Sequence, residues 1–178
     1  MNGYLVIDMS NDFVDDNGSL TAGKVAQDIE GAIIKRLNMF FERGDIIVFC
    51  MDSHIEDDPH FQLWAPHNIK GTWGSDLYGS LFEWYNERKD LKNVYFVEKS
   101  EYDAFYKTDL ENILKQNCVE NVYVSGVCTD ICVFNTVYGA YKAGFKTFVA
   151  ADECATFTQN QKIFLDHMNT IYKTEIIN

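Results

Sequence analysis

The chain has 178 residues, enough for one domain with a full hydrophobic core, and we expect a single domain over residues 1–178. Its net charge of −12 at pH 7 argues against nucleic-acid or anionic-membrane binding, and no stretch approaches the length of a transmembrane helix. The N-terminal residues lack the basic and apolar regions of a signal peptide, and the five cysteines show no paired spacing. We therefore expect a reduced, cytoplasmic protein.

Short apolar runs alternate with helical patterns along the chain. The runs predict buried strands at Tyr4–Ile7, Ile46–Met51, Val94–Val97, Val122–Ser125, Thr147–Ala151 and Thr174–Ile177. Apolar residues at helical spacing predict helices over Val25–Phe41, Leu77–Arg88, Thr108–Gln116, Asp130–Ala143 and Asn160–Met168. Two connections are predicted loops, Ser10–Thr21 and the long segment Ser53–Ser75. This alternation predicts an α/β fold, a three-layer α/β/α sandwich with a mainly parallel sheet of about six strands.

Residues with reactive side chains follow the predicted strands. Right-handed crossovers put the carboxyl ends of parallel strands on one edge of the sheet, where such folds build their sites. The residues at these ends are Asp8, Asp52, Lys99, the Cys128–Cys132 turn and Asp152. The topology therefore predicts a base, a cation and a thiol on one rim.

The Cys128–Cys132 turn joins a predicted strand to a helix. Free backbone N–H groups and the positive end of the helix dipole lie at such a place, so a thiol there should ionise more easily than a free one. One interpretation is a nucleophile with an oxyanion site made by backbone amides. The other is an ordinary βα unit with two packed cysteines.

Asp8 and Lys99 each have an ordinary explanation, as a turn cap and as a solvated lysine at a strand end. Together with Cys132 they would form an acid–cation–thiol group. The carboxylate would take the thiol proton while the ammonium keeps the charge balanced.

Three of the four histidines lie in the long Ser53–Ser75 segment. Asp52 and His54 are two apart in extended backbone, so their side chains project to one side. His60 and His67 follow in the same segment. One aspartate with two or three histidines suits zinc, iron or manganese. The alternative is a set of surface histidines in a polar loop.

Two aromatic residues, Phe13 and Trp64, stand in polar loops on the same rim. They either plug the core or form stacking walls for a flat substrate. The chain has no GxGxxG after a strand and no Walker A sequence, which disfavours a nucleotide-binding site.

Several motifs resemble those of a known enzyme superfamily, the isochorismatase-like cysteine hydrolases. They are Val6-Ile7-Asp8 with Asp12-Phe13, Glu98-Lys99 with Tyr102-Asp103-Ala104-Phe105, and Gly126-Val127-Cys128-Thr129-Asp130-Ile131-Cys132-Val133. Within that superfamily, a further set is similar to the metal-containing nicotinamidases: Asp52-x-His54, Trp64-Ala65-Pro66-His67 and Gly71-Thr72. The resemblance runs from Asp8 to Asp152 in consistent order.

The resemblance implies a metal-dependent nicotinamidase that hydrolyses nicotinamide to nicotinate and ammonia in NAD salvage and also admits pyrazinamide. Asp8 would be the general base, Cys132 the nucleophile that forms a thioester, and Lys99 the cation that tunes both. Backbone N–H groups of Cys128 and Cys132 would hold the oxyanion, with a cis Val127–Cys128 peptide.

The resemblance also implies a cofactor and a substrate pocket. Asp52, His54 and His67 would bind one divalent metal, zinc first with iron or manganese as alternatives. His60 is the candidate fourth ligand, at a spacing where some relatives have a histidine and others use a nearby carboxylate. Around the ring, Phe13 and Trp64 would form a sandwich and Tyr102 would close the pocket. The implied partners are the small-molecule substrate and a second copy of the chain.

The motifs depart from the usual pattern at Cys128, where alanine is more common. Two other functions stay open. One is a related hydrolase of another small amide, an N-carbamoyl compound or a vinyl ether, which has no need of the Asp52, His54 and His67 set. The other is a catalytically silent binding module, against which the joint presence of Asp8, Lys99 and Cys132 argues.

Overall fold

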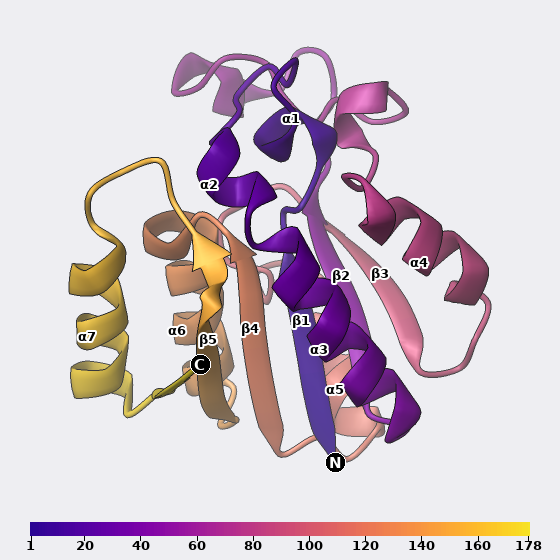
Figure 1. Ribbon diagram of the computed structural model, residues 1–178, viewed down its shortest axis with the longest axis vertical. Helices are drawn as coiled ribbons and strands as arrows, with labels where there is room; N and C mark the ends of the chain where they lie inside the picture. The colour runs from indigo at the N-terminus through magenta and orange to yellow at the C-terminus, as the bar shows by residue number, and fades with distance from the viewer.

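The predicted strands form one parallel sheet in the computed structural model, which describes residues 1–178 (Figure 1). The strands are β1 (Asn2–Ile7), β2 (Ile46–Asp52), β3 (Val94–Lys99), β4 (Asn121–Val127), β5 (Lys146–Ala155) and β6 (Glu175–Ile177). Their order is β3-β2-β1-β4-β5-β6, and every neighbouring pair is parallel. The order reverses between β1 and β4, and sheets of this kind bind ligands beyond the strand ends at such a point.

Helices cover both faces of the sheet, which confirms the predicted three layers (Figure 1). Their bounds are α1 (Asn11–Val14), α2 (Lys24–Gln27), α3 (Glu30–Glu42), α4 (Ser80–Arg88), α5 (Leu110–Gln116), α6 (Phe134–Lys142) and α7 (Gln161–Tyr172). Short turns of 3₁₀ helix occupy Pro59–Gln62 and Trp73–Ser75, and a π-helical turn occupies Thr129–Val133.

Strand β1 lies in the middle of the sheet and contributes to both cores. Tyr4 and Val6 face the layer of α3 and α4, whereas Leu5 and Ile7 face the layer of α5, α6 and α7. This alternation follows from the two-residue period of a strand. Because both faces are covered, the central strands are almost entirely apolar and buried, as the sequence predicted.

The structure differs from the predicted elements near both ends of the chain. The helical pattern over Val25–Phe41 divides into α2 and α3, and the predicted loop Ser10–Thr21 contains α1. Strand β5 continues past Asp152, the predicted strand end, to Ala155, after a register shift in its pairing with β4. Asp152 is exposed within the strand, so its predicted place on the rim is wrong.

A buried carboxylate explains why β5 can continue. Glu153 is 2% exposed, and its side chain accepts a hydrogen bond of 2.8 Å from the Tyr4 hydroxyl and pairs with Arg36 of α3. A buried charge is tolerated when it is paired and hydrogen-bonded. Both partners are far away in sequence, so the local pattern of β5 alone did not indicate this extension.

Strand β4 approaches β1 very closely where it ends. Gly126 has a φ of +110°, and a Cβ atom there would lie 2.0 Å from the carbonyl oxygen of Ile7. Only glycine fits such a position. The following Val127–Cys128 peptide bond is cis, as the family resemblance implied.

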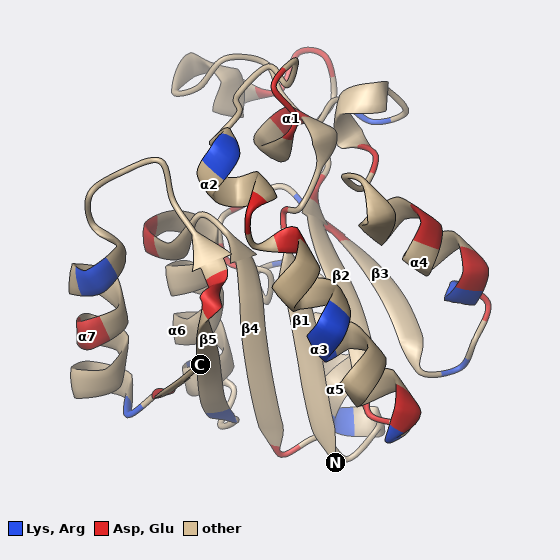
Figure 2. Cartoon of the chain, in the orientation of Figure 1, with Lys and Arg blue, Asp and Glu red and all other residues tan.

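The acidic excess of the sequence is spread over the molecule. Lysine and arginine positions lie apart from one another on α2, α3, α4 and α7, and acidic positions occur on most of the same elements (Figure 2). None of the helices is long and apolar enough to cross a membrane.

Candidate active site

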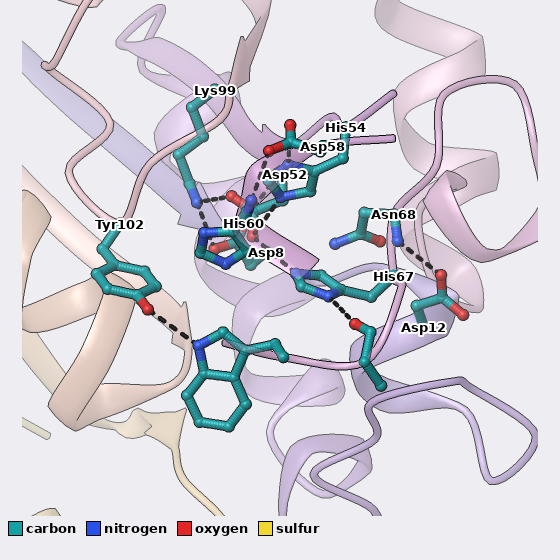
Figure 3. Close-up of polar contacts among 12 residues, drawn as sticks. Asp8, Asp12, Asp52, His54, Asp58, His60, His67, Asn68, Lys99 and Tyr102 are labelled. Carbon is teal, nitrogen blue, oxygen red and sulfur yellow. Dashed lines mark hydrogen bonds and ion pairs between the residues drawn. The ribbon is translucent and has the colours of Figure 1, made fainter. Parts of the chain in front are cut away.

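The carboxyl ends of β1, β3 and β4 bring together the three side chains of the predicted acid–cation–thiol group. Asp8, Lys99 and Cys132 are 1%, 3% and 5% exposed. The Lys99 ammonium lies 2.7 Å from Asp8 Oδ2 and also pairs with Asp52 Oδ1 (Figure 3). The Cys132 sulfur lies within 4.8 Å of carboxylate oxygens of both aspartates. A thiol, a carboxylate and a cation thus share one water-poor site.

Asp8 is held in place by its backbone and by β2. Its φ of 54° is in the left-handed region, which a non-glycine residue adopts at a cost of about 1–3 kcal/mol. Its Oδ1 accepts a hydrogen bond of 2.8 Å from the amide of Asp52, and its own amide donates to the carbonyl of Cys50 at 3.0 Å. The carboxylate is therefore fixed while its second oxygen faces Lys99 and Cys132.

The two carboxylates of this site have opposite pKa shifts. Burial and the nearby charge of Asp52 raise the pKa of Asp8 to about 6. Burial also acts to raise the pKa of Asp52, but Lys99 and the nearby imidazoles of His54 and His67 outweigh it and hold that pKa well below its ordinary value. Asp52 therefore keeps its charge, whereas Asp8 can accept a proton near neutral pH.

The expectation that the Cys132 thiol ionises easily is wrong for the resting site. Burial raises its pKa well above that of a free thiol, and although Lys99 lowers it, Asp8 and Asp52 raise it again. The resting group is a neutral thiol beside a carboxylate, so forming the thiolate requires proton transfer to Asp8.

The three histidines of the long segment converge beside Asp52 (Figure 3). One ring nitrogen from each of His54, His60 and His67 lies within 4.8 Å of the others. Asp52 Oδ2 is 3.7 Å from His54 Nε2 and 3.8 Å from His67 Nε2. The rings of His54 and His60 stack with centroids 4.9 Å apart. The structure therefore gathers all four predicted ligands around one point.

The hydrogen bonds of the histidines fit a metal ion at that point. His54 Nδ1 is 2.9 Å from Asp58 Oδ2, and His67 Nδ1 is 2.6 Å from the carbonyl of Ala65. With Nδ1 donating to these oxygens, each Nε2 atom keeps a free lone pair for a metal ion, which is how metal-binding histidines are usually oriented. His54 Nε2 is buried and has no hydrogen-bond partner. A nitrogen-rich set with one carboxylate suits zinc, iron or manganese.

A second group of ligand-type atoms, those of Asp8, Asp52 and Cys132, does not fit a cation. The Lys99 ammonium already contacts both carboxylates there. A divalent ion at the same place would face this positive charge at close range. The histidine side of Asp52 is therefore the candidate metal centre.

The Cys132 thiol, His60 and His67 line one pocket of about 420 Å³, part of which is open to solvent. Nine of its twelve lining residues are hydrophobic, as is usual for a site that takes a small organic ligand. Phe13 and Trp64 both line it, and Trp64 Nε1 donates to the Tyr102 hydroxyl at 2.9 Å. The Phe13 ring contacts His67 with centroids 5.1 Å apart. The predicted aromatic residues thus meet at the pocket.

The turn after β4 lies against the same pocket. Cys128 and Cys132 both line it, and the amide of Cys128 donates to no acceptor within the protein. Amides in the first turn of a helix are free in this way. The two residues that were predicted to hold an oxyanion therefore border the pocket, next to the thiol.

Sequence reasoning gave no role to Asp58 or Asp12, which support the histidine cluster. Asp58 contacts His54 and, as the cap of the 3₁₀ turn, accepts a hydrogen bond of 2.9 Å from the amide of His60. Asp12 Oδ2 accepts from the amide of Asn68 at 2.7 Å, next to His67 (Figure 3). An aspartate directly before a proline is a known sign of a helical start, so Asp58 could have been found.

Comparison with known proteins places the chain in a family. The isochorismatase domain family matches residues 3–175. The chain belongs to the isochorismatase family. This isochorismatase-family chain superimposes on the pyrazinamidase/nicotinamidase of Streptococcus mutans with a TM-score of 0.97 and 40% identity, over 99% of this chain and 100% of that chain. The isochorismatase-family protein PncA of Bacillus subtilis is 44% identical over 158 residues, 87% of this chain and 86% of that protein.

One structural relative of this isochorismatase-family chain was solved with a metal. The pyrazinamidase of Pyrococcus horikoshii, in complex with zinc, has a TM-score of 0.87 and 26% identity, over 99% of this chain and 98% of that chain. The resemblance that the motifs indicated is confirmed, and so is the α/β sandwich fold.

Proposed function

We propose that this chain is a nicotinamidase that acts as a single domain, hydrolysing nicotinamide to nicotinate and ammonia. The observation that carries the proposal is the meeting of the Asp8–Lys99–Cys132 group with a histidine cluster in one apolar pocket. A thiol beside a base suits acyl transfer, and a pocket lined by aromatic side chains suits a small flat ring. Relatives named nicotinamidase and pyrazinamidase support the same activity.

In the first half of the reaction Asp8 takes the proton of the Cys132 thiol, and the thiolate attacks the carboxamide carbon. The raised pKa of Asp8 helps this transfer, since a base near neutral pKa both accepts and returns a proton. The resulting oxyanion would accept hydrogen bonds from the backbone amides of Cys128 and Cys132. Lys99 balances the charge throughout, because it contacts Asp8 and remains protonated.

In the second half the C–N bond breaks and ammonia leaves with the proton that Asp8 had taken. The acyl group then remains on Cys132 as a thioester. Asp8, again a carboxylate, takes a proton from a water molecule that attacks the thioester carbon. Nicotinate is released and the thiol of Cys132 is restored, so one water molecule is consumed for each amide cleaved.

Asp52, His54, His60 and His67 would hold the divalent ion, with zinc the first candidate. When bound, such an ion supplies a Lewis-acidic point that can hold the pyridine nitrogen. The carboxylates of Asp52 and Asp58 place negative charge beside His54 at this point. Burial opposes protonation of His54, yet the carboxylates of Asp52 and Asp58 outweigh it and raise its pKa.

The histidine cluster also weighs against the main alternative, a hydrolase of another small amide. An aliphatic or N-carbamoyl substrate lacks a ring nitrogen, so it gains nothing from His60 and His67 on the pocket wall. The apolar sides formed by Phe13 and Trp64 likewise suit an aromatic ring more than an open chain.

The decisive experiment measures ammonia release from nicotinamide by metal-loaded protein. Cys132→Ala should lower turnover about a thousandfold or more, while its metal content stays at the wild-type value. Cys118→Ala is the matched control, because Cys118 is an exposed thiol remote from the pocket. Chelation should also lower turnover of wild-type protein. Full activity in Cys132→Ala would contradict the assignment of Cys132 as the nucleophile. No turnover by metal-loaded wild-type protein would contradict the assignment of nicotinamide as the substrate.

We also expect a cytoplasmic location and a particular oligomeric state for this enzyme. All five cysteines are free, which suits the reducing cytoplasm. We expect a homo-oligomer, most simply a dimer with twofold symmetry. Light scattering on the purified protein tests this, and a monomer at all concentrations would contradict it.

A further inference from the structure

A turn joins β5 to α7 (Figure 1). An aromatic side chain of this turn lines the pocket. This residue is Phe157, which lines the pocket although 54% of its surface is exposed. It takes no part in the proton transfers or the candidate metal centre described above. An exposed aromatic ring at a pocket mouth has apolar surface in contact with water, and a bound ligand would bury that surface.

Asp130, two residues before the nucleophile candidate, holds this turn in place. Its carboxylate accepts hydrogen bonds from the hydroxyls of Thr156 at 2.6 Å and Thr158 at 2.5 Å, and a longer one of 3.4 Å from Asn160. Thr156 and Thr158 directly flank Phe157, so the backbone is tied on both sides of the ring. Hydrogen bonds to a charged acceptor are roughly twice as strong as neutral ones.

Further contacts join the same two turns. Thr129 Oγ1 donates to Gln161 Oε1 at 2.5 Å, and Gln161 in turn donates to a carbonyl of β5 at 2.8 Å. Burial and the charge of Asp130 raise the pKa of the Cys128 thiol to about 12, and the nearby Phe157 amide and Thr156 hydroxyl partly offset this. The nucleophile turn and the Phe157 turn therefore form one hydrogen-bonded unit.

The other parts of the pocket wall have roles under the proposed function. The histidine cluster faces the ring nitrogen, Cys132 faces the carboxamide, and Phe13 and Trp64 lie along the ring faces. The hydrophobic lining residues left without a role are Leu20, Val127, Ile131 and Phe157. Phe157 is the largest of these and is more exposed than Val127 or Ile131, so it has the most surface to offer.

We propose that Phe157 is a specificity-determining residue, an inference that rests on the proposed function. Its ring would limit the size of a substituent on the edge of the substrate ring that faces neither Cys132 nor the histidines. Nicotinamide is anchored at C3, whose carboxamide meets Cys132, and at N1, which faces the histidines. C5 is the one ring carbon adjacent to neither, so a substituent on C5 points to the remaining wall. Asp130 is a positioning residue that keeps Phe157 at this wall.

The test compares nicotinamide with 5-methylnicotinamide as substrates of the metal-loaded enzyme. The substrate ratio is kcat/KM for the methylated amide divided by kcat/KM for nicotinamide. Phe157→Ala should raise this ratio about tenfold or more, the effect of one methyl group in an apolar pocket. Phe82→Ala is the matched control, since Phe82 of α4 is 45% exposed and does not line this pocket. Its ratio should equal that of the wild type.

A second variant tests the positioning role without altering the nucleophile turn. Thr158→Val removes one hydroxyl donor to Asp130, and Thr170→Val is its control on an exposed position of α7. Thr158→Val should raise the substrate ratio in the same direction, by roughly threefold, and should raise the nicotinamide KM more than it changes kcat. Thr170→Val should change neither.

The outcomes separate this inference from the proposed function. A wild-type substrate ratio in Phe157→Ala, with nicotinamide turnover intact, would overturn the specificity role and leave the nicotinamidase standing. An equal rise of the ratio in Phe82→Ala would overturn it as well, because the effect would not belong to the pocket. Wild-type protein that cleaves neither substrate would overturn both proposals.

Discussion

Removing the Asp58 side chain should weaken metal binding, although Asp58 is not itself a proposed ligand. In Asp58→Ala the ring of His54 loses the acceptor that orients it, 2.9 Å from Nδ1. The amide of His60 loses its cap at the same time, at 2.9 Å. Two candidate ligands would therefore become less well ordered through one substitution.

The expected size of the effect follows from these two contacts. A hydrogen bond to a charged group contributes about 1.5–3 kcal/mol when its geometry is good, and the His54 ring is fully shielded from water. Loss of such a partner behind a metal ligand typically costs about 10–100-fold in affinity, equal to about 1.4–2.8 kcal/mol. The two estimates agree, so we expect the dissociation constant for zinc to rise by that factor.

Competition with a chromophoric chelator measures this constant on the purified apoprotein. Asp57→Ala is the matched control, because Asp57 is the adjacent, exposed aspartate and has no side-chain partner. Asp58→Asn separates the two contacts, since its amide oxygen can still cap His60 but carries no charge for His54. An unchanged zinc affinity in Asp58→Ala would refute the assignment of His54 and His60 as ligands.

Two further substitutions test the framework of the site. Lys99→Met leaves the buried carboxylates of Asp8 and Asp52 without their cation. We therefore expect the free energy of unfolding in urea to fall by about 3–5 kcal/mol, and turnover to be lost. Wild-type stability in this variant would contradict the assignment of Asp8 and Asp52 as buried charges. Gly126→Ala places a Cβ 2.0 Å from the Ile7 carbonyl oxygen at a φ of +110°, and thermal unfolding should show a loss of about 3 kcal/mol. A melting temperature equal to that of wild type would show that β1 and β4 can separate there.

The part of the site that lies at strand ends could be predicted from the sequence. Asp8, Lys99 and Cys132 are far apart in the chain, but the rule that parallel strands end on one edge brings them together. That the side chains of Asp52 and His54 project to one side followed from the two-residue period of extended backbone. Convergence of His60 and His67 depended on the family resemblance, because it requires the loop conformation that Asp58 and Asp12 stabilise.

Features that depend on distant charges could not be predicted in this way. The pKa of Cys132 rises because burial and the charges of Asp8 and Asp52 outweigh that of Lys99, and neither effect is visible in the local sequence. Strand β5 continues beyond Asp152 because the buried Glu153 carboxylate accepts a hydrogen bond from Tyr4 of β1 and pairs with Arg36 of α3. Phe157 lies in a polar stretch that follows no periodic pattern, so only the folded chain places it at the pocket.

The position of Lys99 at the end of an edge strand has a consequence for the alignment of the sheet. Strand β3 pairs with β2 alone, and Lys99 opposite Asp52 is the last pair of that ladder. A slip of one residue would replace the Lys99 side chain with that of Glu98 or Ser100 and turn every side chain of β3 to the opposite face. With Glu98, three carboxylates would meet in the interior and no cation would be near.

The ion pairs of Lys99 with Asp8 and Asp52 therefore also select one alignment of β3, independently of any role in turnover. Edge strands with weak alignment are prone to shifted pairing and to association with other chains. Lys99→Met should accordingly lose hydrogen-exchange protection first along β3, and it should aggregate at protein concentrations where the wild type stays dispersed.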